Sequence, residues 1–307
     1  MTGDGERTAH RPEPAVQAPA SPPASPPSPS ARGSRMLGGR GVLVSTASTI
    51  VFFGVIAIAV VLAPGSAIVR ERFFDPFHLK QSFLGSVTTP SVFEAFLLNV
   101  KMFLIAEAFI LVIALVIAVV RGIPGPVFFP FRAVAIAYTD LFRGVPLILV
   151  LYMIGFGVPG LGLRFFSSQS DVTYGVTALV LVYSAYVAEV YRAGIDSVHE
   201  SQTAAARSLG LTRWQSLRFV VLPQAVRRVI PPLLNDFIGL QKDTALVSVL
   251  GSVEAARAAQ IYGAEQFNYA SYVVAALLFV LITIPLARFT DHLIGRDRRK
   301  RQAGGQV

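Results

Sequence analysis

The longest uncharged stretch of the sequence constrains the fold more than any other feature. From residue 41 to residue 69 the chain has no Asp, Glu, Lys, Arg or His, and roughly 20 apolar residues suffice for a helix to cross a bilayer. Hydrocarbon offers no partner to backbone polar groups, so we expect such segments to be helices. Only 15% of the residues are charged, against about 25% in soluble domains. The sequence therefore predicts an all-α integral membrane protein.

Six apolar segments are long enough to be membrane spans. They lie near residues 42–62, 95–120, 133–158 and 174–190, then from after Pro231 and Pro232 to about residue 250, and at 269–287. We therefore predict six transmembrane helices. Residues 65–93, between the first two spans, are expected to form an extracellular loop.

The distribution of basic residues predicts the orientation. The chain has 27 Lys and Arg against 18 Asp and Glu, a net charge of +9, and cytosolic loops of membrane proteins collect Lys and Arg. With the N-terminus inside, the outer segments hold only Arg70, Arg72, Lys80, Arg164 and Arg257. We therefore expect both termini in the cytosol, with residues 295–307 as a basic tail. Topology and attraction to anionic lipid explain the excess charge, so no nucleic-acid partner is expected.

The N-terminal region has a different composition. Eight of the twenty prolines lie between Pro12 and Pro29, and a stretch this rich in proline and serine cannot bury a core. Residues 1–40 are therefore expected to be a disordered cytosolic tail. The first span, within residues 41–64, begins too late and runs too long for a secretory signal.

A basic loop at residues 196–225 carries helix signals. Ser197 with Glu200, and Thr212 with Gln215, match the capping-box spacing, and Gly210 suits a helix end that needs positive φ. The second helix would pack an apolar stripe against the membrane domain, formed by Trp214, Leu217 and Val221. Two short helices joined by a glycine turn at the cytosolic side predict a docking element for another protein.

Four motifs in and around this loop resemble a known family. Gly210, nine further residues and then Val220, Leu222 and Pro223 resemble the cytosolic loop of permease subunits of ATP-binding cassette (ABC) importers. The resemblance to the polar amino-acid uptake group lies in LFRGVPLIL at 141–149, AYVAEVYRAGIDSV at 185–198, LPQA at 222–225 and NDFIGLQKDTALVSVLG at 235–251. It runs from about residue 94 to residue 294.

The resemblance implies a fold and a set of partners. Residues 94–294 would form the five-helix core of a type I importer permease, with the span at 41–64 as an extra helix. The chain would move a polar amino acid, with a glutamate- or glutamine-like one favoured, in the cell membrane of a bacterium. Its partners would be an ATPase dimer, a second permease subunit and an extracellular solute-binding protein. ATP and Mg²⁺ would bind to the ATPase and no cofactor to this chain.

The resemblance also assigns residues that couple the permease to its ATPase. Ala204 stands where the family motif has Glu, so the matching triplet is all alanine. The implied coupling residues are Gln202, Ala204, Ala205, Ala206, Arg207, Leu209, Gly210, Leu222 and Pro223.

Polar residues inside the apolar segments are candidates for the substrate pathway, because they are costly in a bilayer. Asp140 with Arg143, and Glu189 with Arg192, have the i, i+3 spacing of structural ion pairs. Lys242 lies seven residues after Asn235, two turns along one helix face, and would attract a substrate carboxylate. Glu107 and Asp236 are further buried candidates. The pathway residues we predict are Asp140, Arg143, Tyr186, Glu189, Asn235, Lys242 and Asp243.

The sequence has no pattern typical of a metal site, a disulfide or an ATP-binding site. The chain has no Cys, its four His are scattered, and no GxxxxGK[ST] phosphate-binding loop occurs. It is therefore not expected to be an enzyme or to hydrolyse ATP. Three alternatives stay open: a membrane-embedded hydrolase or transferase, a self-contained secondary transporter or channel, and an ABC permease for another small solute.

Overall fold

The computed structural model describes the backbone from residue 39 to residue 304, and the side chains of residues 45–164 and 167–296. Every regular element in this part is helical. The predicted proline-rich tail lies outside the described residues as far as residue 38, as do residues 305–307 of the basic tail. The chain divides into two units, Met1–Ser66 and Ala67–Val307.

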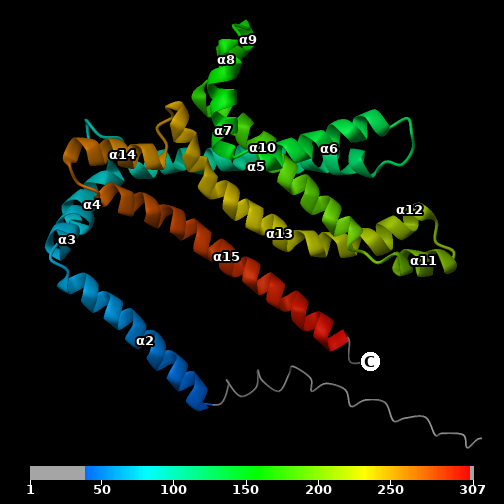
Figure 1. Ribbon diagram of the computed structural model, residues 1–307, viewed down its shortest axis with the longest axis horizontal. Helices are drawn as coiled ribbons and strands as arrows, with labels where there is room; N and C mark the ends of the chain where they lie inside the picture. Colours follow the sequence, from blue (N-terminus) through cyan, green and yellow to red (C-terminus); the bar gives the residue numbers. More distant parts are fainter. Residues whose placement is uncertain (1–38, 305–307) are drawn as a thin grey trace, which may run out of the picture. The chain divides into compact units, whose positions relative to one another are not determined.

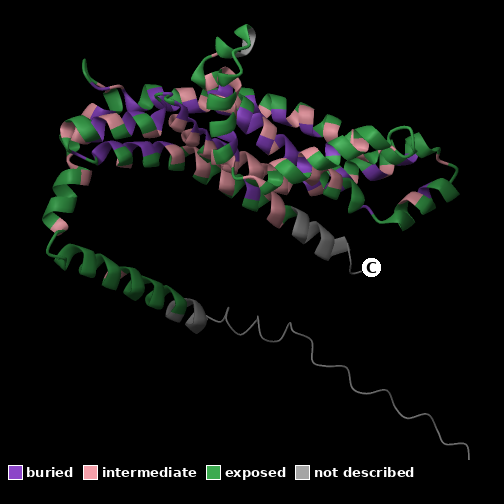
Figure 2. Cartoon of the chain, turned by 45° about the horizontal axis from the view of Figure 1, so that its top comes forward, coloured by how far each residue is buried: buried purple, intermediate pink, exposed green. Residues whose placement is uncertain are grey.

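The first unit contains α2 (Gly39–Leu62), at the position of the first predicted span. Its stretch from Ser45 to Leu62 is strongly apolar, and none of it is buried (Figure 2). Apolar side chains surround the helix, and two of them, Phe52 and Phe53, pack edge to face. A helix that is apolar on all sides and buried on none is suited to lipid rather than water.

The second unit is built from long and short helices (Figure 1). In chain order, eight of them are α3 (Ser66–Phe74), α4 (Pro76–Leu84), α5 (Val92–Gly122), α6 (Phe129–Gly144), α10 (Asp171–Asp196), α13 (Leu222–Asp243), α14 (Ala255–Gln266) and α15 (Ala270–Gly304). In addition, α7 (Leu147–Tyr152), α8 (Val158–Gly160) and α9 (Arg164–Ser167) follow α6, and α11 (Glu200–Ser208) and α12 (Arg213–Ser216) follow α10.

Within the described residues, four helices are long and apolar enough to cross a membrane. They are α2, α5, α10 and α15, and they contain the first, second, fourth and sixth predicted spans. The third predicted span is broken: the chain bends by 108° between α6 and the segment Leu147–Gly160. Pro146 lies at the break, and proline disfavours helical backbone in the residue before it. Counted as one span, this bent pair raises the number to five.

The fifth predicted span takes a different form. We expected the helix to start after Pro231 and Pro232, but α13 begins at Leu222 and continues through both prolines. It has one polar and one apolar face, then tightens into a 3-10 segment at Thr244–Leu250. It is not among the helices apolar enough to span alone, so the count of six is not reached.

α10 lies at the centre of the second unit and packs against α5, α6, α7 and α13. Most of its apolar window is buried, unlike that of α5 or α15. Glycines allow its close approach to neighbouring elements: a Cβ on Gly194 would collide with the side chain of Val229, and one on Gly175 with that of Val247. The core therefore fixes α10 between the helices that contribute the polar residues considered below.

Much of the predicted extracellular loop at 65–93 is helical, as α3 and α4. These helices are joined to the connection between α14 and α15: Arg72 donates to the carbonyl of Phe267 at 2.7 Å, and its own carbonyl accepts from the Tyr269 amide at 2.8 Å. His78 and the buried Tyr262 hydroxyl lie 2.8 Å apart. This segment is thus a packed part of the second unit.

Candidate functional site

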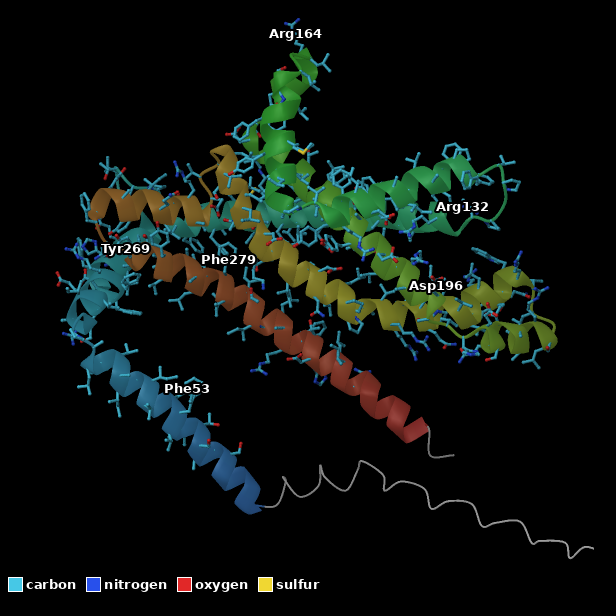
Figure 3. The ribbon with its side chains drawn as sticks, viewed as in Figure 1. Phe53, Arg132, Arg164, Asp196, Tyr269 and Phe279 are labelled. Atoms are coloured by element: carbon cyan, nitrogen blue, oxygen red, sulfur yellow. The ribbon has the colours of Figure 1, made fainter. Side chains whose placement is uncertain are left out.

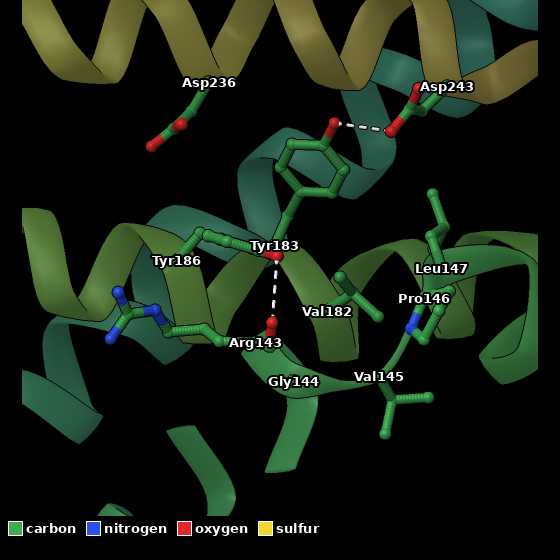
Figure 4. Close-up of a pocket in the computed structure, with 10 residues that line it drawn as sticks. All are labelled: Arg143, Gly144, Val145, Pro146, Leu147, Val182, Tyr183, Tyr186, Asp236 and Asp243. Atoms are coloured by element: carbon green, nitrogen blue, oxygen red, sulfur yellow. Dashed lines mark hydrogen bonds between the residues drawn. The ribbon is translucent and has the colours of Figure 1, made fainter. Parts of the chain in front are cut away.

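A polar pocket of about 420 Å³ opens where α6, α10 and α13 meet (Figure 4). The break after α6 supplies one wall, because the chain turns at residues 144–147 instead of continuing as a helix. α10 and α13 supply the others. The lining residues are Arg143, Gly144, Val145, Pro146, Leu147, Val182, Tyr183, Tyr186, Asp236 and Asp243.

Charges of opposite sign reach this pocket from different helices. Arg143 comes from α6, whereas Asp236 and Asp243 come from α13 and lie across the pocket from it (Figure 4). The Tyr183 hydroxyl donates to Asp243 at 2.8 Å. One oxygen of Asp236, Oδ2, is buried and has no hydrogen-bond partner among the described residues. A buried acceptor without a donor is costly, so this oxygen is suited to a donor from a bound solute.

Tyr186 of α10 contacts Arg143 in two ways. The Tyr186 hydroxyl donates to the Arg143 carbonyl at 3.2 Å, and the guanidinium lies 6.0 Å from the Tyr186 ring. The Arg143 side chain remains 42% exposed, so its charge is available to a ligand. A pocket with one guanidinium and two carboxylates on facing walls can bind a small solute that carries both an anion and a cation.

Glu189 is the centre of an ion-pair cluster beside the pocket. Its carboxylate lies 2.7 Å from Arg121, 2.8 Å from Arg192 and 3.8 Å from Arg143. The expected pair of Glu189 with Arg192 is therefore confirmed. The expected pair of Asp140 with Arg143 is wrong, since Arg143 faces Glu189 and Asp140 is exposed.

The structure brings some of the predicted pathway residues together and separates others. Arg143, Tyr186 and Asp243 line the pocket, and Glu189 lies beside it. Asp140, Asn235 and Lys242 are exposed and do not line it. In the single chain, the face of α13 that meets the pocket is thus the one with Asp236 and Asp243, rather than the one with Asn235 and Lys242.

Two polar lining residues were missing from the predicted pathway: Asp236, which was named only as a further buried candidate, and Tyr183, which was not named at all. A signal existed for each. Asp236 lies seven residues before Asp243, the same two-turn spacing that links Asn235 to Lys242, and Tyr183 lies three residues before Tyr186. Spacing alone could not decide which of two adjacent faces of α13 meets the pocket.

The predicted docking loop forms two short helices. α11 begins at Glu200 with His199 as its N-cap, so the first predicted capping box is wrong: Ser197 ends α10 instead. The second is confirmed, since Thr212 and Gln215 exchange the two capping hydrogen bonds. Gly210 has φ of +86° in the turn between the helices, as predicted.

The exposed side chains of this loop differ from the expected ones. Of the predicted stripe, Val221 is buried and packs with Val198 and Ala225, whereas Trp214 is 67% exposed and Leu217 is exposed as well. In α11, Ala206 is buried whereas its two alanine neighbours are exposed. The remaining predicted coupling residues, Gln202, Arg207, Leu209, Leu222 and Pro223, are exposed too.

Comparison with known proteins places these features in context. Residues 127–299 match the family model described as "Binding-protein-dependent transport system inner membrane component". The chain is 35% identical over 190 residues to the probable glutamine ABC transporter permease protein GlnM of Bacillus subtilis, covering 62% of this chain and 84% of that protein. It is 34% identical over 209 residues to a putative glutamine transport system permease protein GlnP of Rickettsia conorii, covering 67% and 93%.

A solved structure shares the fold. A crystal structure of an amino acid ABC transporter with histidines aligns with a TM-score of 0.61 and 32% identity, over 67% of this chain and 93% of the other.

Proposed function

The chain belongs to the family of inner-membrane components of binding-protein-dependent transport systems, and we propose that its pocket between α6, α10 and α13 carries a glutamine-like amino acid through the membrane. It is a multi-pass ABC permease subunit for amino-acid uptake, and the family works with an ATPase and other subunits. The proposal concerns the substrate, the site and the details of assembly.

The facing charges of the pocket carry the proposal. Every free amino acid has an α-carboxylate and an α-ammonium group. Arg143 offers a fork of N–H donors that matches a carboxylate, while the unpartnered oxygen of Asp236 lies across the pocket as an acceptor for the ammonium. A small solute with only one of these charges would leave a charged wall without a partner.

The balance of charge favours glutamine over glutamate. With the α-groups of the substrate paired to Arg143 and Asp236, the remaining charged group is Asp243. The second carboxylate of glutamate would meet this like charge, whereas the amide of glutamine can donate to it. The glutamine transport named for two relatives supports the same choice.

The proposed assembly follows the family. We place the chain in the cell membrane of a bacterium with both termini cytosolic, in a dimeric permease core, with an ATPase dimer on the cytosolic side and a solute-binding protein outside. ATP and Mg²⁺ belong to the ATPase. The exposed alanines of α11 and the exposed Leu209 and Trp214 are available to that partner.

Binding of radiolabelled L-glutamine to the purified permease–ATPase complex tests the site. Arg143→Gln removes the charge that meets the carboxylate and should weaken binding by at least about 30-fold. Asp236→Asn should weaken it by about tenfold or more, since hydrogen bonds to charged groups contribute about 1.5–3 kcal/mol. The matched control is Asp140→Asn, an exposed residue one turn before Arg143 that does not line the pocket. Full binding by the Arg143 variant would refute the proposed site.

The orientation has its own test, which the absence of Cys makes simple. Gly160 is the last residue of α8 and Ser208 is the last residue of α11, and each is replaced by Cys in turn. We expect an impermeant reagent added outside intact cells to label the first and not the second. The reverse pattern would mean that the topology is inverted.

A further inference from the structure

The Glu189 cluster connects the pocket with the loop that holds α11. Each Glu189 oxygen has a close basic partner: Oε2 accepts from Arg121 at 2.7 Å, and Oε1 accepts from Arg192 at 2.8 Å. Arg121 also donates to the buried Thr139 hydroxyl at 3.0 Å. These contacts join α5, α6 and α10 near the C-terminal end of α10.

Arg143 is the loosest member of this cluster. Its guanidinium lies 3.8 Å from Oε2, beyond hydrogen-bond distance, whereas the other two arginines donate directly. If Arg143 moves toward a ligand, Glu189 keeps two close partners and is not left as an unpaired buried charge. The departure of Arg143 therefore costs little, and the same guanidinium lines the pocket.

The cluster continues to the end of α10. Arg192 donates to Glu189 and also to Asp196, each at 2.8 Å. Asp196 is the last residue of α10 (Figure 3). At the next residue, Arg228 of α13 donates to the Ser197 carbonyl. α11 begins at Glu200, so a chain of ion pairs runs from the pocket to the base of the docking loop.

We infer that Glu189 is a positioning residue that competes with the substrate carboxylate for Arg143, so that filling the pocket alters the ion-pair cluster at the base of α11. This inference rests on the proposed function, because it needs the carboxylate to bind Arg143. In the empty pocket, Arg143 is attracted to Glu189. In the filled pocket, Glu189 is shared by Arg121 and Arg192 alone, which changes how α6 is held to α10.

The inference predicts effects of opposite sign for one substitution. Glu189→Gln removes the competing charge and keeps one acceptor oxygen, which can serve either Arg121 or Arg192, while its amide nitrogen is a donor. Binding of L-glutamine should become about two- to fivefold tighter, the range expected for a partly exposed ion pair. Stimulation of ATP hydrolysis by glutamine-loaded binding protein should fall to less than half, since the ligand no longer changes the cluster.

The experiment measures both quantities on the assembled complex of permease, ATPase and binding protein. The variants are Glu189→Gln, the conservative Glu189→Asp, Arg143→Gln and the double variant of Arg143→Gln with Glu189→Gln. We expect Glu189→Asp to keep most of the stimulation and the affinity of the unmodified chain. In the Arg143→Gln background, the second substitution should leave glutamine binding unchanged.

Each contrary outcome has one meaning. The competition between Glu189 and the substrate carboxylate is refuted if Glu189→Gln lowers both the affinity for glutamine and the stimulation of ATP hydrolysis. It is also refuted if Glu189→Gln tightens binding equally in the Arg143→Gln background. The proposed binding site stands in both cases. If Arg143→Gln binds glutamine normally, the proposed function fails at its site. If the unmodified complex does not bind glutamine, the proposed substrate is wrong.

Discussion

At the residue scale, the buried carboxylate of Glu254 organises the start of α14. It is fully buried and accepts from Asn99 at 3.0 Å and from the Arg257 amide at 2.8 Å. The Asn99 side chain in turn accepts from the Ala255 amide at 3.0 Å. Burial raises the pKa of Glu254, and it outweighs the hydrogen bonds from Asn99 and from the Ala256 and Arg257 amides, which lower the pKa. α14 is not among the spans.

This raised pKa predicts a pH dependence of stability. The folded chain holds the Glu254 proton more tightly than the unfolded chain. The contribution of Glu254 to stability is therefore complete below the pKa that this group has in the unfolded chain. It is lost as the pH rises through the pKa that the group has in the folded chain. Relative to the unmodified protein, Glu254→Gln should therefore gain thermal stability as the pH rises from about 4 to about 8. Melting of purified protein across this range measures the difference.

The control is Glu265→Gln, an exposed position on the same helix. It should show no such trend. The raised pKa of Glu254 would be contradicted if the difference in melting temperature between Glu254→Gln and the unmodified protein stayed constant or fell as the pH rises.

Single residues were the least predictable feature of the site. Arg143 and Asp243 could be predicted because they are charged residues inside apolar segments, and Tyr186 because it lies in the motif at 185–198. All three line the pocket. Whether Asp236 or Asn235 meets the pocket depends on the rotation of α13 about its axis. Packing against α10 sets that rotation, so the rotation cannot be predicted from the spacing of residues within α13.

At the element scale, the turn after α11 depends on its glycine. Gly210 has φ of +86°, and a Cβ there would meet no atom within 4 Å. The cost of a side chain is therefore conformational, about 1–2 kcal/mol for Gly210→Val, and smaller for Gly210→Asn because Asn tolerates this region. We expect the Val variant to lose ATPase co-purification and uptake together, and the Asn variant to keep most of both. Equal behaviour of the two would contradict this role of the turn.

The exposed alanines of α11 give a second test of the docking element. Ala205 is exposed in this chain, so Ala205→Asp should not disturb the fold. In an apolar contact with the ATPase, an unpaired charge would cost on the order of several kcal/mol, and the ATPase should no longer co-purify. Ala264→Asp, exposed on α14, is the control with the same chemical change. Normal co-purification of the Ala205 variant would mean that α11 is only a solvated helix.

Helices with continuous apolar runs were predictable and the others less so. A run such as that of α5 specifies a span by its own composition, and α2, α10 and α15 follow the same rule. α13 has polar residues on one face and two internal prolines, and its neighbours determine where it begins. The break at Pro146 is a local signal, but its angle of 108° depends on packing.

At the scale of the whole molecule, the extra helix α2 belongs to a separate unit, and none of its apolar window is buried. The matched family region, residues 127–299, lies entirely in the second unit. The pocket, the Glu189 cluster and the docking loop also belong to the second unit. The pocket and the docking loop therefore lie in the same unit as the matched family region.

Uptake of L-glutamine into proteoliposomes, with the permease core, its ATPase and its binding protein supplied or withheld one at a time, tests the central claim most directly. We predict uptake only when all are present with ATP and Mg²⁺, and its loss in the Arg143→Gln variant. The Asp140→Asn variant should transport normally. Uptake by this chain without the ATPase would contradict the account, because the chain would then be a self-contained transporter or channel.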